Sequence, residues 1–244
     1  MSKTENLLIE IGTEELPPKS LKKLASAFKD EVVQLLNDAE LKFSAANWYA
    51  TPRRLAIVLS GLEVSQEDKQ QQRRGPSVSV AFDDDGQPTK ATQGFAKSCG
   101  VSVDKLDRIK TDKGEWLAFD TVVKGKNTAE LLPETIETAL NRLPIAKRMR
   151  WGNSDVEFVR PIKWTLVLLG NDYIDCEIMG VRTGKTSFGH RFHHPEAVAI
   201  TSAETYVETL KKEAHVLADY NERSAVIEAQ VKDIANKHNG VVIF

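Results

Sequence analysis

PIAKRMRWGNSDVEFVRP, residues 144–161, is the stretch that we expect to organise the rest of the chain. Its first half gathers cations around one aromatic residue: Lys147, Arg148, Arg150 and Trp151. A turn at residues 152–153 then leads into an apolar strand that carries Arg160. Cations beside an exposed aromatic ring suit a phosphate backbone with a base or sugar nearby. The alternative is a solvated basic turn whose Trp151 belongs to the core, because Trp is mostly buried and charge runs mostly face solvent.

Length and composition limit the classes of protein. The chain has 244 residues, 41% hydrophobic and 28% charged, which predicts a soluble protein of two or three small domains. Its net charge of −2 excludes a protein that is basic overall, so any nucleic-acid contact must come from local patches. No apolar run has the length of a signal peptide or a membrane span, which predicts a cytoplasmic protein without a membrane partner. Two isolated cysteines, Cys99 and Cys176, argue against a disulfide framework or a zinc site.

The first part, residues 1–64, is expected to be a small α+β subdomain with the order strand, helix, strand, strand. Residues 7–11 are almost continuously apolar, which indicates a central strand. A helix opens at Pro17 and Pro18 and keeps one apolar face to about Asn37. Glu14 and Glu15 precede this helix, where the macrodipole favours anions, and a catalytic carboxylate pair is the alternative.

Two further strands, at residues 43–50 and 55–62, flank the turn Thr51-Pro52-Arg53-Arg54. This turn places Arg53 and Arg54 at the rim of the sheet. Two adjacent arginines on a tight turn either grip a phosphate with paired hydrogen bonds or only make the hairpin tip soluble.

The second part, residues 65–144, is expected to be a turn-rich connection followed by a small α+β subdomain. The connection up to Lys90 is polar, with at most one short strand near residues 78–82. The aspartates at 83–85 are interpreted as a turn, because the spacing of a calcium loop is absent. The remaining elements are a helix at 91–98 ended by Gly100, a hairpin of 106–110 with 115–123 across the turn 112–114, and a helix at 129–143 with Thr128 as N-cap.

The third part, residues 145–200, is basic and rich in strands, expected at 162–169 and 173–179. Between Pro144 and His194 it carries eight Lys or Arg against five Asp or Glu. Gly184-Lys185-Thr186 is not a P-loop, because that motif needs a glycine where Met179 stands. No cysteine or carboxylate pair accompanies His190, His193 and His194, so we predict no metal site. The Gly-His-Arg turn at 189–191 is better suited to presenting donors to a phosphate.

The fourth part, residues 201–244, is expected to be helical, at residues 203–213 and 219–237. The apolar run at 241–244 resembles the start of a strand, so we expect this part to lead into a further domain of a longer protein. The fold class predicted for the chain is α+β, with two or more small subdomains of mostly antiparallel sheet and packed helices, and a C-terminal helical segment.

Several motifs occur in an order that is specific to one family. They are GTEELPP (12–18), TPRRLA (51–56), GP (75–76), GFA (94–96), KRMRWG (147–152), FVRP (158–161) and GHRF (189–192). The chain thereby resembles the β subunit of bacterial heterotetrameric glycyl-tRNA synthetase, over essentially its whole length. The family's β subunit is longer, and the part beyond this chain carries an HD-type domain and an anticodon-binding domain.

The resemblance implies a role in the ATP-dependent attachment of glycine to tRNA(Gly) by an α2β2 assembly. In that family the α subunit holds the class II active site, which uses ATP with Mg, and the β subunit binds tRNA. The implied partners are therefore the α subunit, a second β subunit and tRNA(Gly), with no DNA. The implied role of this chain is noncatalytic, with no cofactor of its own.

The residues predicted to contact RNA are the cations and aromatic groups of these basic turns. They are Arg53, Arg54, Lys147, Arg148, Arg150, Trp151, Arg160, Lys185, His190 and Arg191. A second hypothesis is a subunit-assembly scaffold that uses the Glu14-Glu15 turn, exposed Trp residues and hairpin edges. A third, a hydrolase using Glu14, Glu15 and a histidine, lacks a convincingly spaced nucleophile and base.

Overall fold

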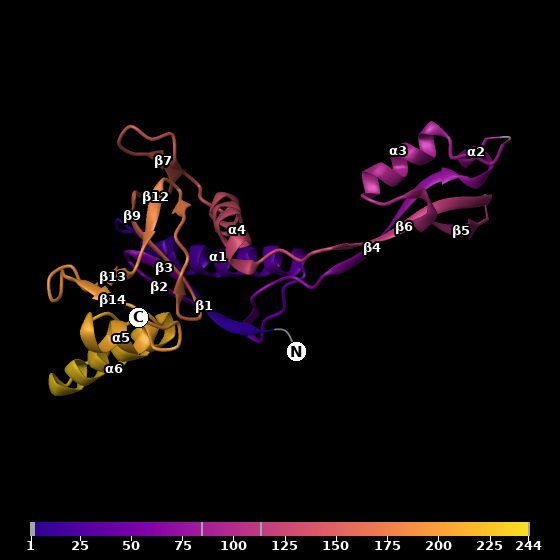
Figure 1. Ribbon diagram of the computed structural model, residues 1–244. Coiled ribbons are helices and arrows are strands. Elements are labelled where there is room, and N and C mark those ends of the chain that lie inside the picture. The colour runs from indigo at the N-terminus through magenta and orange to yellow at the C-terminus, as the bar shows by residue number, and fades with distance from the viewer. Residues whose placement is uncertain (1–2, 84, 113, 244) are drawn as a thin grey trace. The chain divides into compact units, whose positions relative to one another are not determined.

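The computed structural model describes residues 3–83, 85–112 and 114–243 (Figure 1). These residues form two compact units. Unit 1 combines the chain up to Gln66 with the chain from Lys126 onward, and unit 2 is Glu67–Gly125. Helices and mostly antiparallel strands occur in both units, so the predicted α+β class is confirmed.

Unit 1 is built on a seven-stranded sheet with the order β11-β12-β9-β1-β3-β2, in which β10 also pairs with β9. The strands are β1 (Thr4–Thr13), β2 (Ala45–Thr51), β3 (Arg54–Glu63), β9 (Ile162–Leu169), β10 (Asp172–Tyr173), β11 (Glu177–Ile178) and β12 (Val181–Gly184). Only the β12–β9 pair is parallel. The predicted central position of β1 is confirmed, since β3 and β9 flank it along most of its length.

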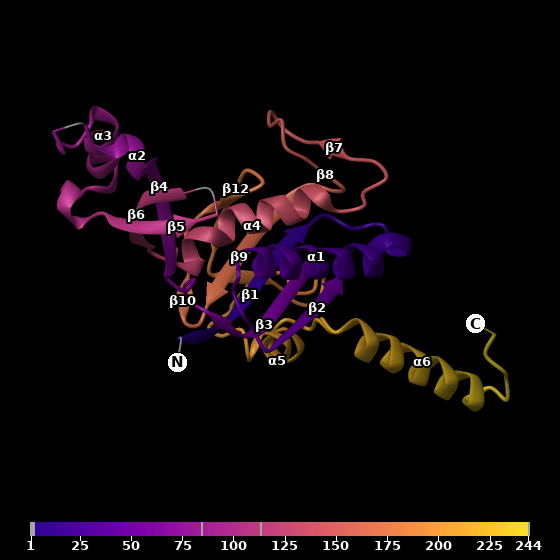
Figure 2. The ribbon, with the colours of Figure 1, turned by 90° about the vertical axis from the view of Figure 1, so that its right-hand side faces the viewer.

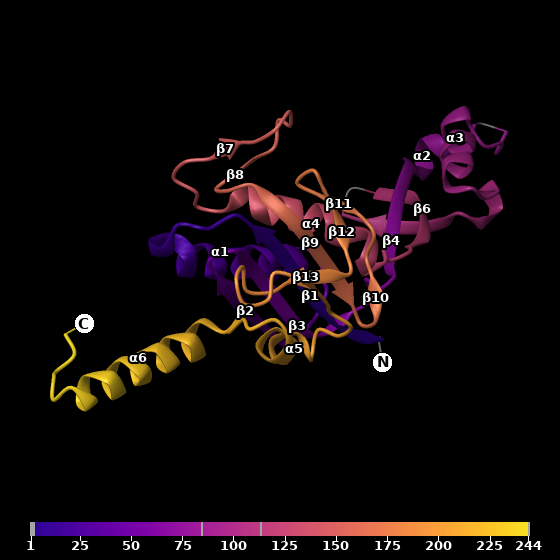
Figure 3. The same ribbon diagram turned by 90° about the vertical axis from the view of Figure 1, so that its left-hand side faces the viewer.

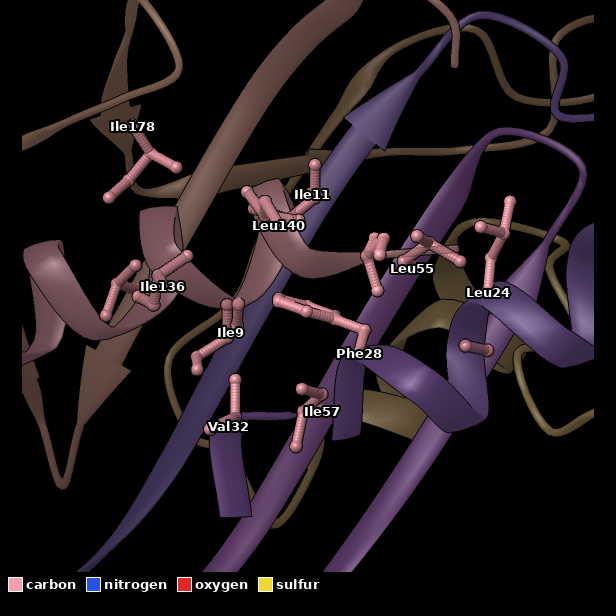
Figure 4. Close-up of a cluster of buried hydrophobic side chains, with 14 of the residues drawn as sticks. Ile9, Ile11, Leu24, Phe28, Val32, Leu55, Ile57, Ile136, Leu140 and Ile178 are labelled. Atoms are coloured by element: carbon pink, nitrogen blue, oxygen red, sulfur yellow. The ribbon is translucent and has the colours of Figure 1, made fainter. Parts of the chain in front are cut away.

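One face of this sheet is covered by α1 (Pro18–Asp38) and α4 (Thr128–Arg142). Figure 4 shows the packing: Ile9 and Ile11 of β1 and Ile57 of β3 meet Phe28 of α1 and Leu140 of α4. Residues of α1 that recur every three or four positions are buried here, as the predicted apolar face requires. This is the main core.

The opposite face packs against α5 (Tyr206–Glu213) and a small two-stranded sheet of β13 (Thr186–Phe188) and β14 (Ala197–Ala199). Leu8 of β1, Ala56 of β3 and Leu166 of β9 supply the sheet side of this second core. Alternation along each strand therefore divides its residues between two cores. Helix α6 (Tyr220–Lys237) follows α5, contains no buried residue and extends away from the sheet of its unit (Figure 2).

Unit 2 is a three-stranded antiparallel sheet with the order β4-β6-β5. Its elements are β4 (Lys69–Ser77), α2 (Val78–Ala81), α3 (Lys90–Cys99), the 3-10 helix η1 (Val103–Lys105), β5 (Asp107–Thr111) and β6 (Gly114–Val123). The helix ended by Gly100 is confirmed, with Gly100 at φ 71°, and so is the hairpin. Asp84 and Lys113, parts of two predicted turns, lie outside the described residues.

Four local predictions were wrong. The polar connection contains the nine-residue strand β4, and residues 78–81 are helical. The β4 residues 69–74 are exposed on both faces at a sheet edge, so no alternation marks the strand.

The predicted strand 173–179 is divided into β10 and β11. Thr128 is the first residue of α4 rather than its N-cap, and its Oγ1 donates to the Glu63 carbonyl at 2.6 Å. Residues 241–243 form no strand, and Phe244 lies outside the described residues.

The compact units also differ from the predicted four-part division. β9 comes from the predicted third part and pairs with β1 of the first part, so both belong to one sheet. Helix α4, which was assigned to the second part, packs in the main core of unit 1. The described residues contain no helix with the length and hydropathy that a membrane crossing needs.

Candidate functional site

Four segments that are distant in sequence meet at one end of the unit 1 sheet. The loop between β1 and α1 donates backbone hydrogen bonds to two of the others. Thr13 N and Leu16 N reach the carbonyls of the turn at residues 52–53, at 2.8 and 2.6 Å. Glu14 N reaches the Pro161 carbonyl, just before β9, at 2.9 Å. The fourth segment, residues 188–195, joins through the side-chain contacts below, so motifs that the sequence separates by up to 180 residues share one site.

Strand register places the inner side chains of this site. Gly12 of β1 lies opposite Arg54 of β3 and opposite Trp164 of β9. All three lie on the face that carries Leu8 and Ala56, which packs against α5. The Trp164 indole occupies the space over Gly12, where an added Cβ would lie 1.9 Å from the ring.

Arg54 lies inside the protein, so its predicted place at the rim of the sheet was wrong. It is only 2% exposed, its Nη2 donates to the Phe188 carbonyl, and its Nε lies 3.9 Å from Glu10 Oε1. Glu10 is fully buried and accepts from Trp164 Nε1 at 2.5 Å and from Ser187 Oγ at 2.6 Å. These contacts bind β1, β3, β9 and β13 together. Arg54 therefore cannot reach a large ligand that stays outside the surface.

Ion pairs hold the Glu14-Glu15 turn. Arg191 contacts Glu15 Oε1 at 3.2 Å and Glu14 Oε2 at 3.6 Å, and Lys163 contacts Glu14 Oε1 at 3.5 Å. Arg160 Nε donates to the Glu15 carbonyl at 3.0 Å. The first turn of α1 contains no acidic residue, so these cations, rather than the helix dipole, account for both carboxylates.

His190 organises the turn that carries Arg191. The ring Nδ1 of His190 accepts from the backbone N–H groups of Phe192 and His193, each at 3.2 Å. The backbone N–H of His190 donates to the Ala214 carbonyl at 2.8 Å. Gly189 fits because a Cβ there would lie 2.2 Å from the His194 carbonyl oxygen. His190 thus has a structural role, and it leaves the Phe192 side chain 82% exposed.

A hollow of about 430 Å³ opens between these segments and the α5–α6 connection. Four arginines line it: Arg53, Arg54, Arg191 and Arg223. The apolar part of the lining includes Trp164, Phe192 and Leu217. Arg223 Nη1 donates to the Leu217 carbonyl at 2.6 Å, and burial lowers the pKa of its guanidinium below its ordinary value. The hollow thus combines cations with apolar walls.

The structure brings together five of the ten predicted site residues. Arg53, Arg54, His190 and Arg191 line the hollow, and Arg160 lies in the adjoining depression with Glu14, Glu15 and Arg191. Lys185 lies outside both, with its Nζ 5.2 Å from the centre of the Tyr173 ring. Trp164, Phe192 and Arg223 were missed. The position of Phe192 directly after Gly-His-Arg was the available signal, whereas Arg223 stands in a helical pattern that gave none.

The other four predicted residues lie on the hairpin of β7 (Met149–Arg150) and β8 (Glu157–Phe158), which is separated from β13 in both views that label β13 (Figures 1 and 3). Arg150 pairs with Asp155 at 2.8 Å and Glu157 at 3.3 Å, and Arg148 donates to backbone carbonyls. Lys147 is exposed, while Trp151 is half-buried against the main core, in agreement with the core interpretation. All four Trp residues of the chain are buried or half-buried, so the exposed Trp surface suggested for assembly was wrong.

Comparison with known proteins identifies the family. The family model described as glycyl-tRNA synthetase beta subunit matches residues 7–244. The chain belongs to that family. Among its relatives, the glycine–tRNA ligase beta subunit of Hahella chejuensis is 48% identical over 239 residues, and that of Glaesserella parasuis is 49% identical over 238 residues. Each alignment covers 98% of this chain and 34% of the relative, so the chain spans about a third of the length of the glycyl-tRNA synthetase beta subunits it matches.

Within the described residues, no group of three or more His, Cys, Asp or Glu side chains could hold a metal ion. The histidines at 190, 193 and 194 are close in sequence, but the Nδ1 of His190 already accepts two backbone hydrogen bonds. The chemistry offered by the site is therefore that of guanidinium donors and aromatic rings.

Proposed function

We propose that the chain acts as the N-terminal part of a glycine–tRNA ligase β subunit. In this role it supports ATP-dependent glycylation of tRNA(Gly) in the cytoplasm, through tRNA binding and assembly with the α subunit and a second β subunit. ATP and Mg are used through the α subunit, and this chain is noncatalytic. Support comes from the family match over residues 7–244 and from the family name that its relatives carry.

The observation that carries the tRNA contact is the set of exposed cations around the motif segments of unit 1. Lys147 and Arg150 are exposed at the β7–β8 hairpin, and Lys163 and Arg191 are exposed beside the Glu14-Glu15 turn with which they pair. Exposed Lys and Arg attract a phosphate backbone by charge and release counterions when they bind it. Recognition of a folded tRNA by such groups reads mainly its backbone and shape.

The test is binding of the 244-residue chain to tRNA(Gly) and to a non-cognate tRNA over a series of salt concentrations. We expect the affinity to fall with salt concentration. In the double variant Lys147→Ala/Arg150→Ala, the slope of log K against log salt concentration should become less negative by about 1 to 2. Arg182→Ala is the matched control, because Arg182 is exposed, bonds Asp175 at 2.6 Å and does not line the hollow. Absence of tRNA binding at low salt would contradict the proposed contact.

A second candidate, a pure assembly scaffold with RNA binding carried elsewhere in the subunit, has support from α6. Three large apolar residues of this helix are exposed: Ile227, Val231 and Ile234. Exposed apolar residues on one element are typical of surfaces that meet another protein. Mixing the chain with the α subunit and measuring complex mass by sedimentation separates the two roles, because a scaffold forms the complex without binding tRNA.

A further inference from the structure

Some buried guanidinium nitrogens in the hollow donate no hydrogen bond to any described residue. Arg54 is 98% buried, yet its Nε and Nη1 form no hydrogen bond with a described residue. Arg53, its neighbour on the turn, likewise has a buried Nε without such a bond. A buried charged donor without a partner costs stability, so its persistence in a folded protein indicates that something else satisfies it.

The charge balance of the hollow favours an anion. Among the residues that line it, all of which the structure describes, Glu15 carries the only carboxylate, and Arg191 already pairs with it. Glu10, the carboxylate nearest to Arg54, uses its Oε1 to accept from Trp164 and Ser187. Arg54 is ion-paired with Glu10, since its Nε lies 3.9 Å from Glu10 Oε1. Arg53 and Arg223 have no carboxylate partner among the lining residues, so the lining is positive overall. A guanidinium fork matches the geometry of phosphate oxygens.

The walls indicate what the anion is attached to. Phe192 stands 82% exposed, the largest exposed fraction of any large apolar side chain outside residues 241–243 among the described residues. Trp164 lies inside, with the guanidinium carbon of Arg53 5.8 Å from its ring centroid. The volume of about 430 Å³ is within the range of small-ligand sites. An aromatic ring beside cations is the arrangement on which nucleobases stack.

We propose that this hollow binds a nucleotide, with its phosphate at Arg53 and Arg54 and its base against Phe192. Two sources share this chemistry: a free nucleoside monophosphate and one residue of an unpaired RNA strand. The proposal deepens the proposed function, and rests on it where the nucleotide belongs to RNA. It differs from the general tRNA contact because it requires the half-buried Arg53 and the buried Arg54, and not the exposed cations of the β7–β8 hairpin.

The experiment is calorimetric titration of the 244-residue chain with inorganic phosphate, adenosine, AMP and a four-residue oligoadenylate. We expect AMP to bind at least tenfold more tightly than adenosine or phosphate alone. Arg53→Ala should weaken AMP binding at least tenfold, while Arg53→Lys, which keeps the charge and loses the fork, should fall between. Phe192→Ala should weaken AMP binding and leave phosphate binding unchanged. Arg182→Ala is the matched control and should behave as the unsubstituted chain.

The outcomes separate the sources and the two proposals. Binding of the oligonucleotide with the same Arg53 dependence, and without binding of AMP, assigns the hollow to an RNA strand, whereas the reverse assigns it to a free nucleotide. If tRNA binds the chain but neither AMP nor the oligonucleotide does, or if Arg53→Ala binds both normally, the nucleotide site is refuted and the proposed function stands. If AMP binds and tRNA does not, the site stands and the tRNA contact fails. Circular dichroism of Arg53→Ala excludes loss of folding as the cause.

Discussion

Gly12 shows how one residue without a side chain determines the geometry of the site. It faces Trp164 across the β1–β9 pair, and an added Cβ would lie 1.9 Å from the indole. The close approach lets Trp164 Nε1 reach the buried carboxylate of Glu10. The backbone of Gly12 is not left-handed, so the glycine is needed for space and not for conformational freedom.

Gly12→Ala should therefore displace the indole and lower the free energy of unfolding by about 1 to 3 kcal/mol, the usual cost of overpacking. Urea unfolding followed by Trp fluorescence measures both effects. Gly184→Ala in β12 is the control, since its Cβ would meet only the Thr165 carbonyl oxygen, at an ordinary 3.9 Å. Equal stability of the two variants would mean that Trp164 does not need the space over Gly12.

The two arginines of the turn show what the sequence could predict at this scale. The hairpin that carries them was predicted correctly, but Arg54, which was placed in the turn at the rim, is the first residue of β3 and is buried. Whether a residue at a strand end points in or out depends on the register with β1, and a hairpin motif does not contain that register. The hydrogen-bond partners of Glu10 could not be predicted either. They are Trp164 of β9 and Ser187 of β13, which lie next to Glu10 only in the folded protein.

At the scale of elements, prediction succeeded where burial imposes a period. The two apolar faces of β1, the single apolar face of α1 and the hairpin at residues 54–63 with β2 were all predictable, since each fills a core on a regular spacing. It failed for β4, whose exposed residues 69–74 are polar on both faces, and for β10 and β11, which are too short to carry a pattern. Of the site, the basic turns could be predicted, but not which of them meet.

Tyr206 of α5 should make the free energy of unfolding depend on pH in the alkaline range. Burial, and then the negative charge of Glu10, raises the pKa of Tyr206 well above its ordinary value of 10.0. The native state holds this proton more tightly than the unfolded chain does. The contribution is therefore fully present below about pH 10 and is lost as the pH rises further, because the unfolded state ionises first.

Tyr206→Phe tests this directly, since the ring that packs under the sheet is retained while the ionising group is removed. We expect the free energy of unfolding to fall less steeply between pH 9.5 and 11 than in the unsubstituted chain, as measured by urea unfolding at each pH. Some decline should remain, because burial and then Asp219 also raise the pKa of Tyr49. Identical slopes in both proteins would show that Tyr206 ionises equally in the folded and unfolded states.

At the scale of the whole molecule, the chain leaves unit 1 and returns to it at adjacent points. Gln66 N donates to the Lys126 carbonyl at 2.9 Å, and Lys126 N donates to Gln66 Oε1 at 3.1 Å. Gln66 Nε2 also donates to the Ala39 carbonyl, at the end of α1. The outgoing and returning segments are thus bonded to each other and to unit 1 before unit 2 begins. Unit 2 therefore has the connectivity of an insertion.

Replacing residues 67–125 by two glycines should consequently leave unit 1 folded, with an unfolding free energy that is unchanged or higher, because each halving of a connection saves about 0.6 kcal/mol of closure entropy. Deleting residues 145–200, which the sequence had suggested as a part of its own, should instead abolish cooperative unfolding. That deletion removes β9, which pairs with β1 over residues 7–13 and contributes to both cores. Thermal unfolding followed by circular dichroism compares the two chains. A folded second chain would show that the cores of unit 1 do not depend on the pairing of β1 with β9. An unfolded first chain would show that unit 1 needs unit 2 in order to fold.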